Sequence, residues 1–156
     1  MSKINGIYAA SVSVLDKELN LDVDKTIKHA ENLILQGCHG VVIFGSTGQA
    51  QLISVAEKTK LIEKLSKNKF KNNYIIGTGF NSLKETINFL NVCKNFNFEN
   101  FLIMPPAYYF YTDNDAIKFY SEIIKIHPWC KIILYNFEKL CGYKFSVECV
   151  EELVKK

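Results

Sequence analysis

The sequence lacks the features that direct a protein to a membrane or to nucleic acid. It has no apolar run approaching the roughly 18–20 residues that cross a bilayer, and residues 1–5 begin no signal peptide. Its net charge is only +3, and its lysines are scattered among acidic residues rather than clustered. We therefore expect a soluble protein whose partners include neither nucleic acid nor a membrane.

Cysteines are present, but not in a pattern that builds a disulfide framework or a zinc site. Their number, five, is odd, and no two have the C-x-x-C spacing. Reduced thiols in the cytoplasm fit this pattern best. The residues concerned are Cys38, Cys93, Cys130, Cys141 and Cys149.

The length of 156 residues allows one ordinary domain, and the 48% hydrophobic share is that of a packed globular protein. We therefore expect a single domain over residues 1–156. The same length is too short for a complete (β/α)8 barrel, which typically takes about 250 residues.

Short apolar runs alternate with amphipathic helical stretches along the whole chain. Ser54–Glu57 and Ser82–Glu85 each have the spacing of a capping box that starts a helix. Strands are expected at residues 8–14, 40–44, 74–77, 101–104 and 131–135. Helices are expected to begin near residue 24, at Ser54 and Ser82, at Thr112 or Asp113, and at Ser146.

Five successive strand–helix units predict parallel strands joined by right-handed crossovers. Two α/β architectures fit this order. One is an open doubly wound sheet of the flavodoxin type, and the other is the first five units of a (β/α)8 barrel. In both, ligands bind at the carboxyl ends of the strands.

The residues after the second expected strand are suited to an anion. Gly45, Ser46, Thr47 and Gly48 combine small side chains, two hydroxyls and consecutive backbone amides, which together suit a carboxylate or a phosphate. A tight strand-to-helix turn without a ligand explains the same residues. The segment is not a P-loop, because no lysine follows the second glycine.

Two tyrosines, Tyr109 and Tyr135, follow the fourth and fifth strands, where a phenol could transfer a proton. They could equally be core aromatics with a hydrogen-bonded tip. No histidine stands at the carboxyl end of a strand. His29, His39 and His127 therefore predict neither a nucleophile–His–acid set nor a metal site.

Four strand-end segments follow one another in a recognisable order. They are GSTGQ at 45–49, GTG at 77–79, PPAYY at 105–109, and YN at 135–136 with Gly142 beyond it. Over residues 6–156 the chain resembles the dihydrodipicolinate synthase/N-acetylneuraminate lyase family of class I, Schiff-base pyruvate aldolases. The resemblance implies a (β/α)8 TIM barrel, of which this sequence supplies about five units and lacks strands six to eight.

The resemblance also implies roles for the strand-end residues. The 45–48 loop would bind the carboxylate of pyruvate or another 2-oxo acid, with Ser46 and Thr47 as its main groups. Tyr135 would relay protons. Tyr109, with Tyr108 as the alternative, would match the tyrosine that reaches into the site of a neighbouring subunit in a dimer or tetramer. The second substrate would be an aldehyde, and no cofactor or metal is implied.

The family's Schiff-base lysine lies at the end of strand six, which this sequence does not contain. A substitute would have to point into the barrel mouth from apolar surroundings that lower its pKa. Lys131 lies at the wrong end of its strand, and Lys139 and Lys144 lie in a polar loop. We therefore expect no Schiff-base lysine in this chain and no aldolase activity from it alone.

Leu140 stands where dihydrodipicolinate synthases have an arginine that supports a substrate carboxylate. N-acetylneuraminate lyases have an apolar residue there, so Leu140 favours a sugar-acid or other aldolase. A 4-hydroxy-tetrahydrodipicolinate synthase of lysine biosynthesis stays open, because Lys139 could replace the arginine. Glu138 stands at a position that is usually proline, which makes this loop atypical of both synthases and lyases.

Two further interpretations stay open. A flavodoxin-like binding domain would need a phosphate loop after the first strand, but residues 11–20 contain no glycine. A non-catalytic partial barrel would act by association, because open edges at the first and fifth strands favour self-association.

Overall fold

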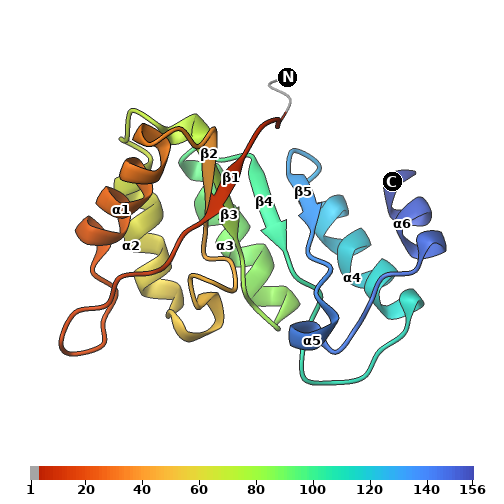
Figure 1. Ribbon diagram of the computed structural model, residues 1–156. Coiled ribbons are helices and arrows are strands. Elements are labelled where there is room, and N and C mark those ends of the chain that lie inside the picture. The colour runs from red at the N-terminus through yellow and green to blue at the C-terminus, as the bar shows by residue number, and fades with distance from the viewer. Residues whose placement is uncertain (1–3) are drawn as a thin grey trace.

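Five parallel strands form one sheet in their order along the chain, β1-β2-β3-β4-β5, in the computed structural model, which describes residues 4–156 (Figure 1). The strands are β1 (Tyr8–Ala10), β2 (Gly40–Ile43), β3 (Tyr74–Gly77), β4 (Asn100–Ile103) and β5 (Lys131–Leu134). A flavodoxin-type sheet has the order 2-1-3-4-5, so that alternative is wrong. Sequential parallel strands are those of a (β/α)8 barrel, and this chain forms a partial one.

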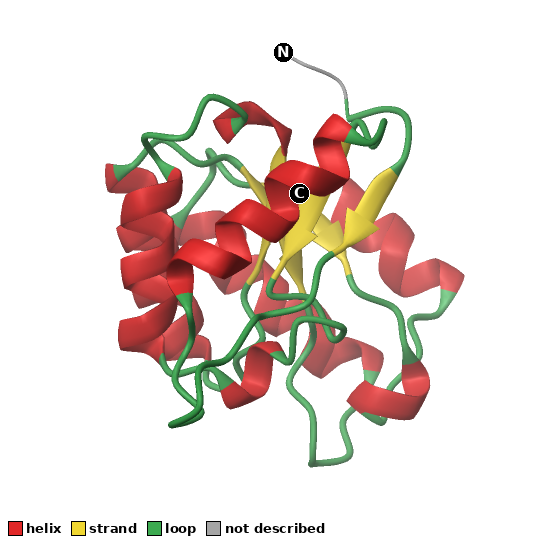
Figure 2. Ribbon diagram, turned by 60° about the vertical axis from the view of Figure 1, so that its left-hand side comes forward, coloured by secondary structure: helices red, strands yellow, loops and turns green. Residues whose placement is uncertain are grey.

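The helices form a layer that follows the same order. Contacts join α1 to α2, α2 to α3, α3 to α4 and α4 to α6, and in Figure 2 the helices lie beside and in front of the strands. They are α1 (Val23–Leu35), α2 (Val55–Leu65), α3 (Leu83–Asn95), α4 (Asp113–Ile126) and α6 (Val147–Val154). The loops that leave the carboxyl ends of the strands gather at the lower end of Figure 1. No helix in residues 4–156 is long and apolar enough to cross a membrane.

Alternation along the strands separates an outer face, packed on the helices, from an inner face. The outer residues belong to the hydrophobic core and are almost completely buried: Val41, Ile43, Ile76, Phe101 and Ile103. Val42 and Leu102, which lie between them, point to the other side and are only half-buried, whereas Ile75 on that side is buried. All four residues of β5 are half-buried. In a closed barrel this second face would line the interior.

The first strand is shorter than the apolar pattern predicted, because the chain leaves the sheet soon after Ala10. The Ser11 amide still donates to the Val42 carbonyl, at 3.0 Å. The Val14 amide instead donates to Thr26 Oγ1 of α1, at 3.0 Å. The prediction of a strand over residues 8–14 is therefore wrong beyond Ala10.

Capping residues start the helices largely as expected. Ser54 and Glu57 form the complete capping box of α2, whereas Ser82 only accepts the Glu85 amide at the start of α3. Thr112, not Asp113, caps α4. Three short helices were not predicted, because three or four residues show no periodicity: η1 (Ala50–Leu52), η2 (Lys71–Asn73) and α5 (Glu138–Cys141).

Candidate active site at the carboxyl ends of the strands

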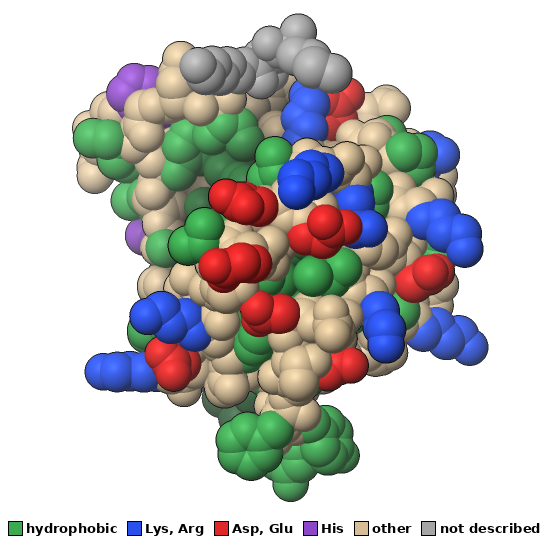
Figure 3. Space-filling view, turned by 90° about the vertical axis from the view of Figure 1, so that its right-hand side faces the viewer, with side chains coloured by type: hydrophobic (Ala, Val, Ile, Leu, Met, Phe, Trp, Pro, Cys, Tyr) green, Lys and Arg blue, Asp and Glu red, His purple; other side chains and the backbone are tan. Residues whose placement is uncertain are grey.

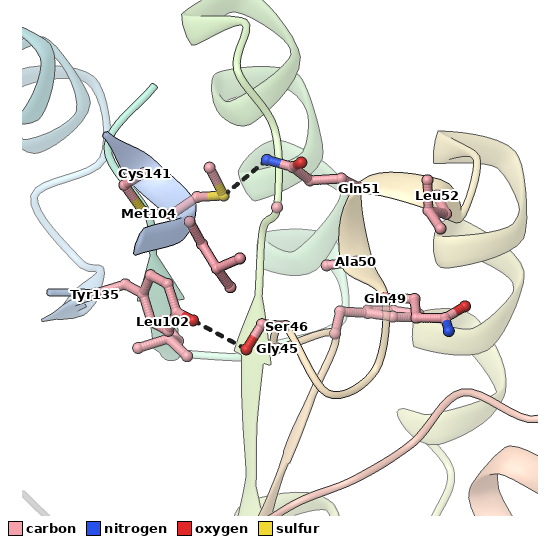
Figure 4. A pocket seen from close by; sticks show the side chains of 13 residues that line it. Gly45, Ser46, Gln49, Ala50, Gln51, Leu52, Leu102, Met104, Tyr135 and Cys141 are labelled. Atoms are coloured by element: carbon pink, nitrogen blue, oxygen red, sulfur yellow. Dashed lines mark hydrogen bonds between the residues drawn. The ribbon is translucent and has the colours of Figure 1, made fainter. Parts of the chain in front are cut away.

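A cavity of about 320 Å³ lies where β2, β3, β4 and β5 end (Figure 4). The loop after β2 forms one wall with Gly45, Ser46 and η1. The opposite wall comes from the end of β4, from Tyr135 after β5, and from α5. This is the edge of the sheet at which ligands bind in parallel α/β folds.

A hydrogen bond joins the two walls. The Tyr135 hydroxyl donates to Ser46 Oγ over 2.9 Å, although the two residues are 89 positions apart in the sequence. In Figure 4 the Tyr135 ring points its hydroxyl at Ser46. The structure therefore brings together two of the residues that the sequence singled out, in a position to share a proton.

Three consecutive amides of the same loop are left without an internal partner. Among the hydrogen bonds of residues 4–156, none uses the backbone N–H of Ser46, Thr47 or Gly48 as a donor. The loop is also a tight turn, because the Gln49 amide donates to the Ser46 carbonyl over 3.0 Å. The two explanations of this segment are thus compatible, since the turn is what presents the amides.

Thr47 and Gly48 do not line the cavity, and they differ from each other in role. The Thr47 side chain is exposed. Gly48 is buried, and its carbonyl accepts a hydrogen bond from Ser13 Oγ over 2.6 Å. A Cβ at Gly48 would lie 2.9 Å from the Ser11 carbonyl oxygen, so this glycine lets the loop approach the end of β1.

Tyr109 lies far from the other candidate residues, on an exposed aromatic tip. Tyr108, Tyr109 and Phe110 are 87%, 76% and 99% exposed in the loop between β4 and α4. A hydrophobic knob projects in Figure 3 from the lower end of the molecule, where this loop lies in Figure 1. Within one chain Tyr109 therefore does not meet Ser46 and Tyr135.

Leu140 lines the cavity from α5, and no lysine of residues 4–156 does. Lys139 and Lys144 are exposed, and Lys131 forms an ion pair with Glu99 at the opposite end of the sheet. The described residues also contain no group of three His, Cys, Asp or Glu side chains that could hold a metal ion.

A buried lysine beside the site was not predicted from the sequence. Lys58 of α2 is completely buried, and its Nζ donates to the Thr78 carbonyl over 2.7 Å and lies 3.9 Å from the centre of the Phe80 ring. Burial lowers the pKa of this amine to about 8. The burial of Lys58 could have been predicted from the helical periodicity, because residue 58 begins the apolar stripe that continues at Leu61, Ile62 and Leu65.

Comparison with known proteins agrees with this geometry. A model of the dihydrodipicolinate synthetase family matches residues 3–156. The chain belongs to this family. A 4-hydroxy-tetrahydrodipicolinate synthase of Methanospirillum hungatei is 27% identical over 153 residues, which are 96% of this chain and 52% of that protein. An N-acetylneuraminate lyase of Salmonella paratyphi B is 26% identical over 152 residues, covering 97% of this chain and 51% of the lyase.

Solved structures of other proteins share the fold. The dihydrodipicolinate synthase of Agrobacterium tumefaciens has a TM-score of 0.89 at 23% identity, over 96% of this chain and 54% of its own. CdNal of Clostridium difficile, solved in complex with mannosamine, has a TM-score of 0.87 at 25% identity, over 99% of this chain and 54% of its own. The chain thus spans about half the length of the curated relatives and solved structures that it matches.

Proposed function

We propose that the cavity is the 2-oxo acid site of a pyruvate-dependent class I aldolase, which makes or breaks a carbon–carbon bond. The observation that carries this proposal is the hydrogen bond from Tyr135 to Ser46 beside the three unpartnered amides of the 46–48 loop. The amide and hydroxyl of Ser46, the one of these three residues that lines the cavity, would hold the carboxylate, and Tyr135 would pass protons to and from the reacting carbonyl.

The covalent step in such aldolases is the attack of a lysine amine on the 2-oxo group, which forms an imine that acts as an electron sink. No lysine of the described residues lines the cavity. We therefore expect the 156-residue chain to bind pyruvate without forming the imine. Tyr109, on its exposed tip, would complete the site of a second copy in a homo-oligomer, and no cofactor or metal enters this scheme.

The choice between synthase and lyase depends on Leu140. The two curated relatives differ in name but hardly in identity, at 27% and 26%, so they do not decide. Leu140 lies on the cavity wall, where an arginine could bind a second carboxylate. A leucine cannot, and a charge-assisted hydrogen bond contributes about 1.5–3 kcal/mol. We favour a sugar-acid or other aldolase over a synthase of lysine biosynthesis.

The test combines pyruvate binding with borohydride trapping. We expect calorimetry or NMR to detect noncovalent pyruvate binding that Ser46→Ala weakens about tenfold and that a remote control, Ser66→Ala, leaves unchanged. Mass spectrometry after borohydride treatment should show no pyruvate adduct. Binding that ignores Ser46→Ala would overturn the carboxylate site. An adduct that Lys139→Ala abolishes would overturn the expectation that the chain lacks a Schiff-base lysine.

A further inference from the structure

The two hydroxyls that line the cavity lie at one end of it. They belong to Ser46 and Tyr135, which are joined by a hydrogen bond beside the loop after β2. None of the residues in 4–156 that line the cavity carries a charge. A ligand held at this end by its carboxylate therefore extends toward walls that offer it no ionic partner.

Those walls are apolar and come from three separate elements. Leu52 ends η1, Leu102 and Met104 lie at the end of β4, and Leu140 and Cys141 belong to α5. Leu52 is 79% exposed and Leu140 is 52% exposed, so two leucines remain accessible on the rim of the cavity. On the part of the site that residues 4–156 form, these accessible apolar side chains favour contact with an apolar group.

The two glutamines of the lining do little to change this character. In Figure 4 the Gln49 side chain extends away from Ser46 and Tyr135. The Gln51 amide reaches across instead and donates to Met104 Sδ over 3.3 Å. A polyhydroxylated chain would thus find few partners on these walls, and each hydroxyl buried without a hydrogen bond weakens binding.

We propose that the substrate of this site is a 4-hydroxy-2-oxo acid with an apolar substituent on C4. Pyruvate and an apolar aldehyde form it through a new C3–C4 bond, as a C3 proton of pyruvate passes to the aldehyde oxygen, and the reverse step releases both molecules. This inference rests on the proposed function, because the amide and hydroxyl of Ser46 must hold the 2-oxo acid end. It selects, among the aldolases that Leu140 favours, an apolar substrate class over the sugar acids. Leu52, Leu102 and Leu140 form the surface that recognises the substituent.

Three probes test the inference on the 156-residue chain by NMR or calorimetry: pyruvate, phenylpyruvate and the polyhydroxylated 2-keto-3-deoxygluconate. We expect phenylpyruvate to bind about tenfold more tightly than pyruvate, because its ring buries apolar area equivalent to roughly two methylenes. 2-Keto-3-deoxygluconate should bind more weakly than phenylpyruvate. The Leu52→Ser/Leu140→Ser variant changes two accessible residues and should lose most of the phenylpyruvate advantage.

Leu19→Ser is the matched control, because Leu19 is 78% exposed and lies outside the cavity lining. The control should keep the ratio of the two affinities. Pyruvate binding with no gain for phenylpyruvate, or a gain that the double variant retains, would overturn the inference and leave the proposed function standing. Tighter binding of 2-keto-3-deoxygluconate than of phenylpyruvate would also overturn the inference and leave the proposed function standing. If neither pyruvate nor phenylpyruvate binds, the proposed function and the inference fall together.

Discussion

The outer and inner faces of the sheet are built from alternate residues of the same short strands, but they differ in what covers them. Phe101 and Ile103 point outward into the helix layer and are completely buried. Leu102, between them, points inward and reaches the cavity at the carboxyl ends. The strand pattern of a parallel sheet is apolar on both faces, so hydrophobicity alone does not tell the two apart.

The outer face contributes mainly to the stability of the fold, whereas the inner face carries the candidate site. Almost all fully buried apolar side chains of the sheet lie on the outer face, where burial contributes roughly 25 cal/mol per Å². The inner face and the loops at its carboxyl end keep accessible side chains, which a ligand can contact. Substitutions on the two faces should therefore have different consequences.

The largest effect is expected from a pair of neighbours on β4. Phe101→Ala should lower the free energy of unfolding by about 3–5 kcal/mol, because the ring fills the core and packs edge-to-face on Trp129 at 5.8 Å. Leu102→Ala should cost about 1–2 kcal/mol, because its side chain is half-buried and lies on the inner face. Urea denaturation of both variants measures the difference. Equal losses would show that the inner face is as well packed as the outer one.

The next largest effect is the pH dependence of stability that a buried lysine in the helix layer causes. The pKa of Lys58 is about 8 in the folded chain and 10.5 when unperturbed, so the unfolded state binds this proton more tightly. The cost of burying the charge is present below pH 8 and disappears as the pH rises to about 10.5. Relative to Lys58→Met, the free energy of unfolding should therefore increase by about 3 kcal/mol over this range.

The comparison with Lys58→Met removes the opposing contribution of the cysteines. Burial raises the pKa of Cys130 to about 12, so that thiol destabilises the fold as the pH rises above its ordinary value of 9.0. This contribution to the free energy of unfolding is common to both proteins and cancels in their difference. The difference in free energy of unfolding between the two proteins could instead stay constant from about pH 7 to 10.5. That result would mean that water reaches Lys58 and that the helices pack less tightly on the sheet than the structure shows.

Much of this architecture could be predicted from the sequence, because periodicity and capping are local signals. The third strand was predicted with its observed bounds, and Ser54, Ser82 and Ser146 cap the helices expected to follow them. The end of β1 was not predictable. Val12 and Val14 continue the apolar alternation, but Thr26 of α1 draws the Val14 amide out of the sheet.

The candidate site was only partly predictable for a similar reason. Ser46 and Tyr135 could be placed at the same edge of the sheet from topology, and they do meet. Other features of the site depend on η1 and on the backbone of the 45–49 turn. These features are the exposure of Thr47 and the positions of Leu52 and Met104 in the cavity lining. Gln49 has a φ of 52°, a left-handed conformation that the sequence does not specify for a non-glycine residue.

The smallest effect is expected from a methyl group added at the edge of the cavity. A Cβ at Gly45 would have Val42 Cγ1, at 3.7 Å, as its nearest neighbour, which is an ordinary van der Waals contact. Gly45→Ala should therefore change the free energy of unfolding by less than about 0.5 kcal/mol, since its φ lies outside the left-handed region. Gly77→Ala is the contrasting variant, because its Cβ would lie 2.0 Å from the Phe44 carbonyl oxygen and would force the backbone apart. Thermal or urea unfolding of the pair decides whether the loop after β2 leaves real space beside Ser46. A loss at Gly45 as large as that at Gly77 would mean that this space is closed in solution, and the cavity would then be too tight for a carboxylate.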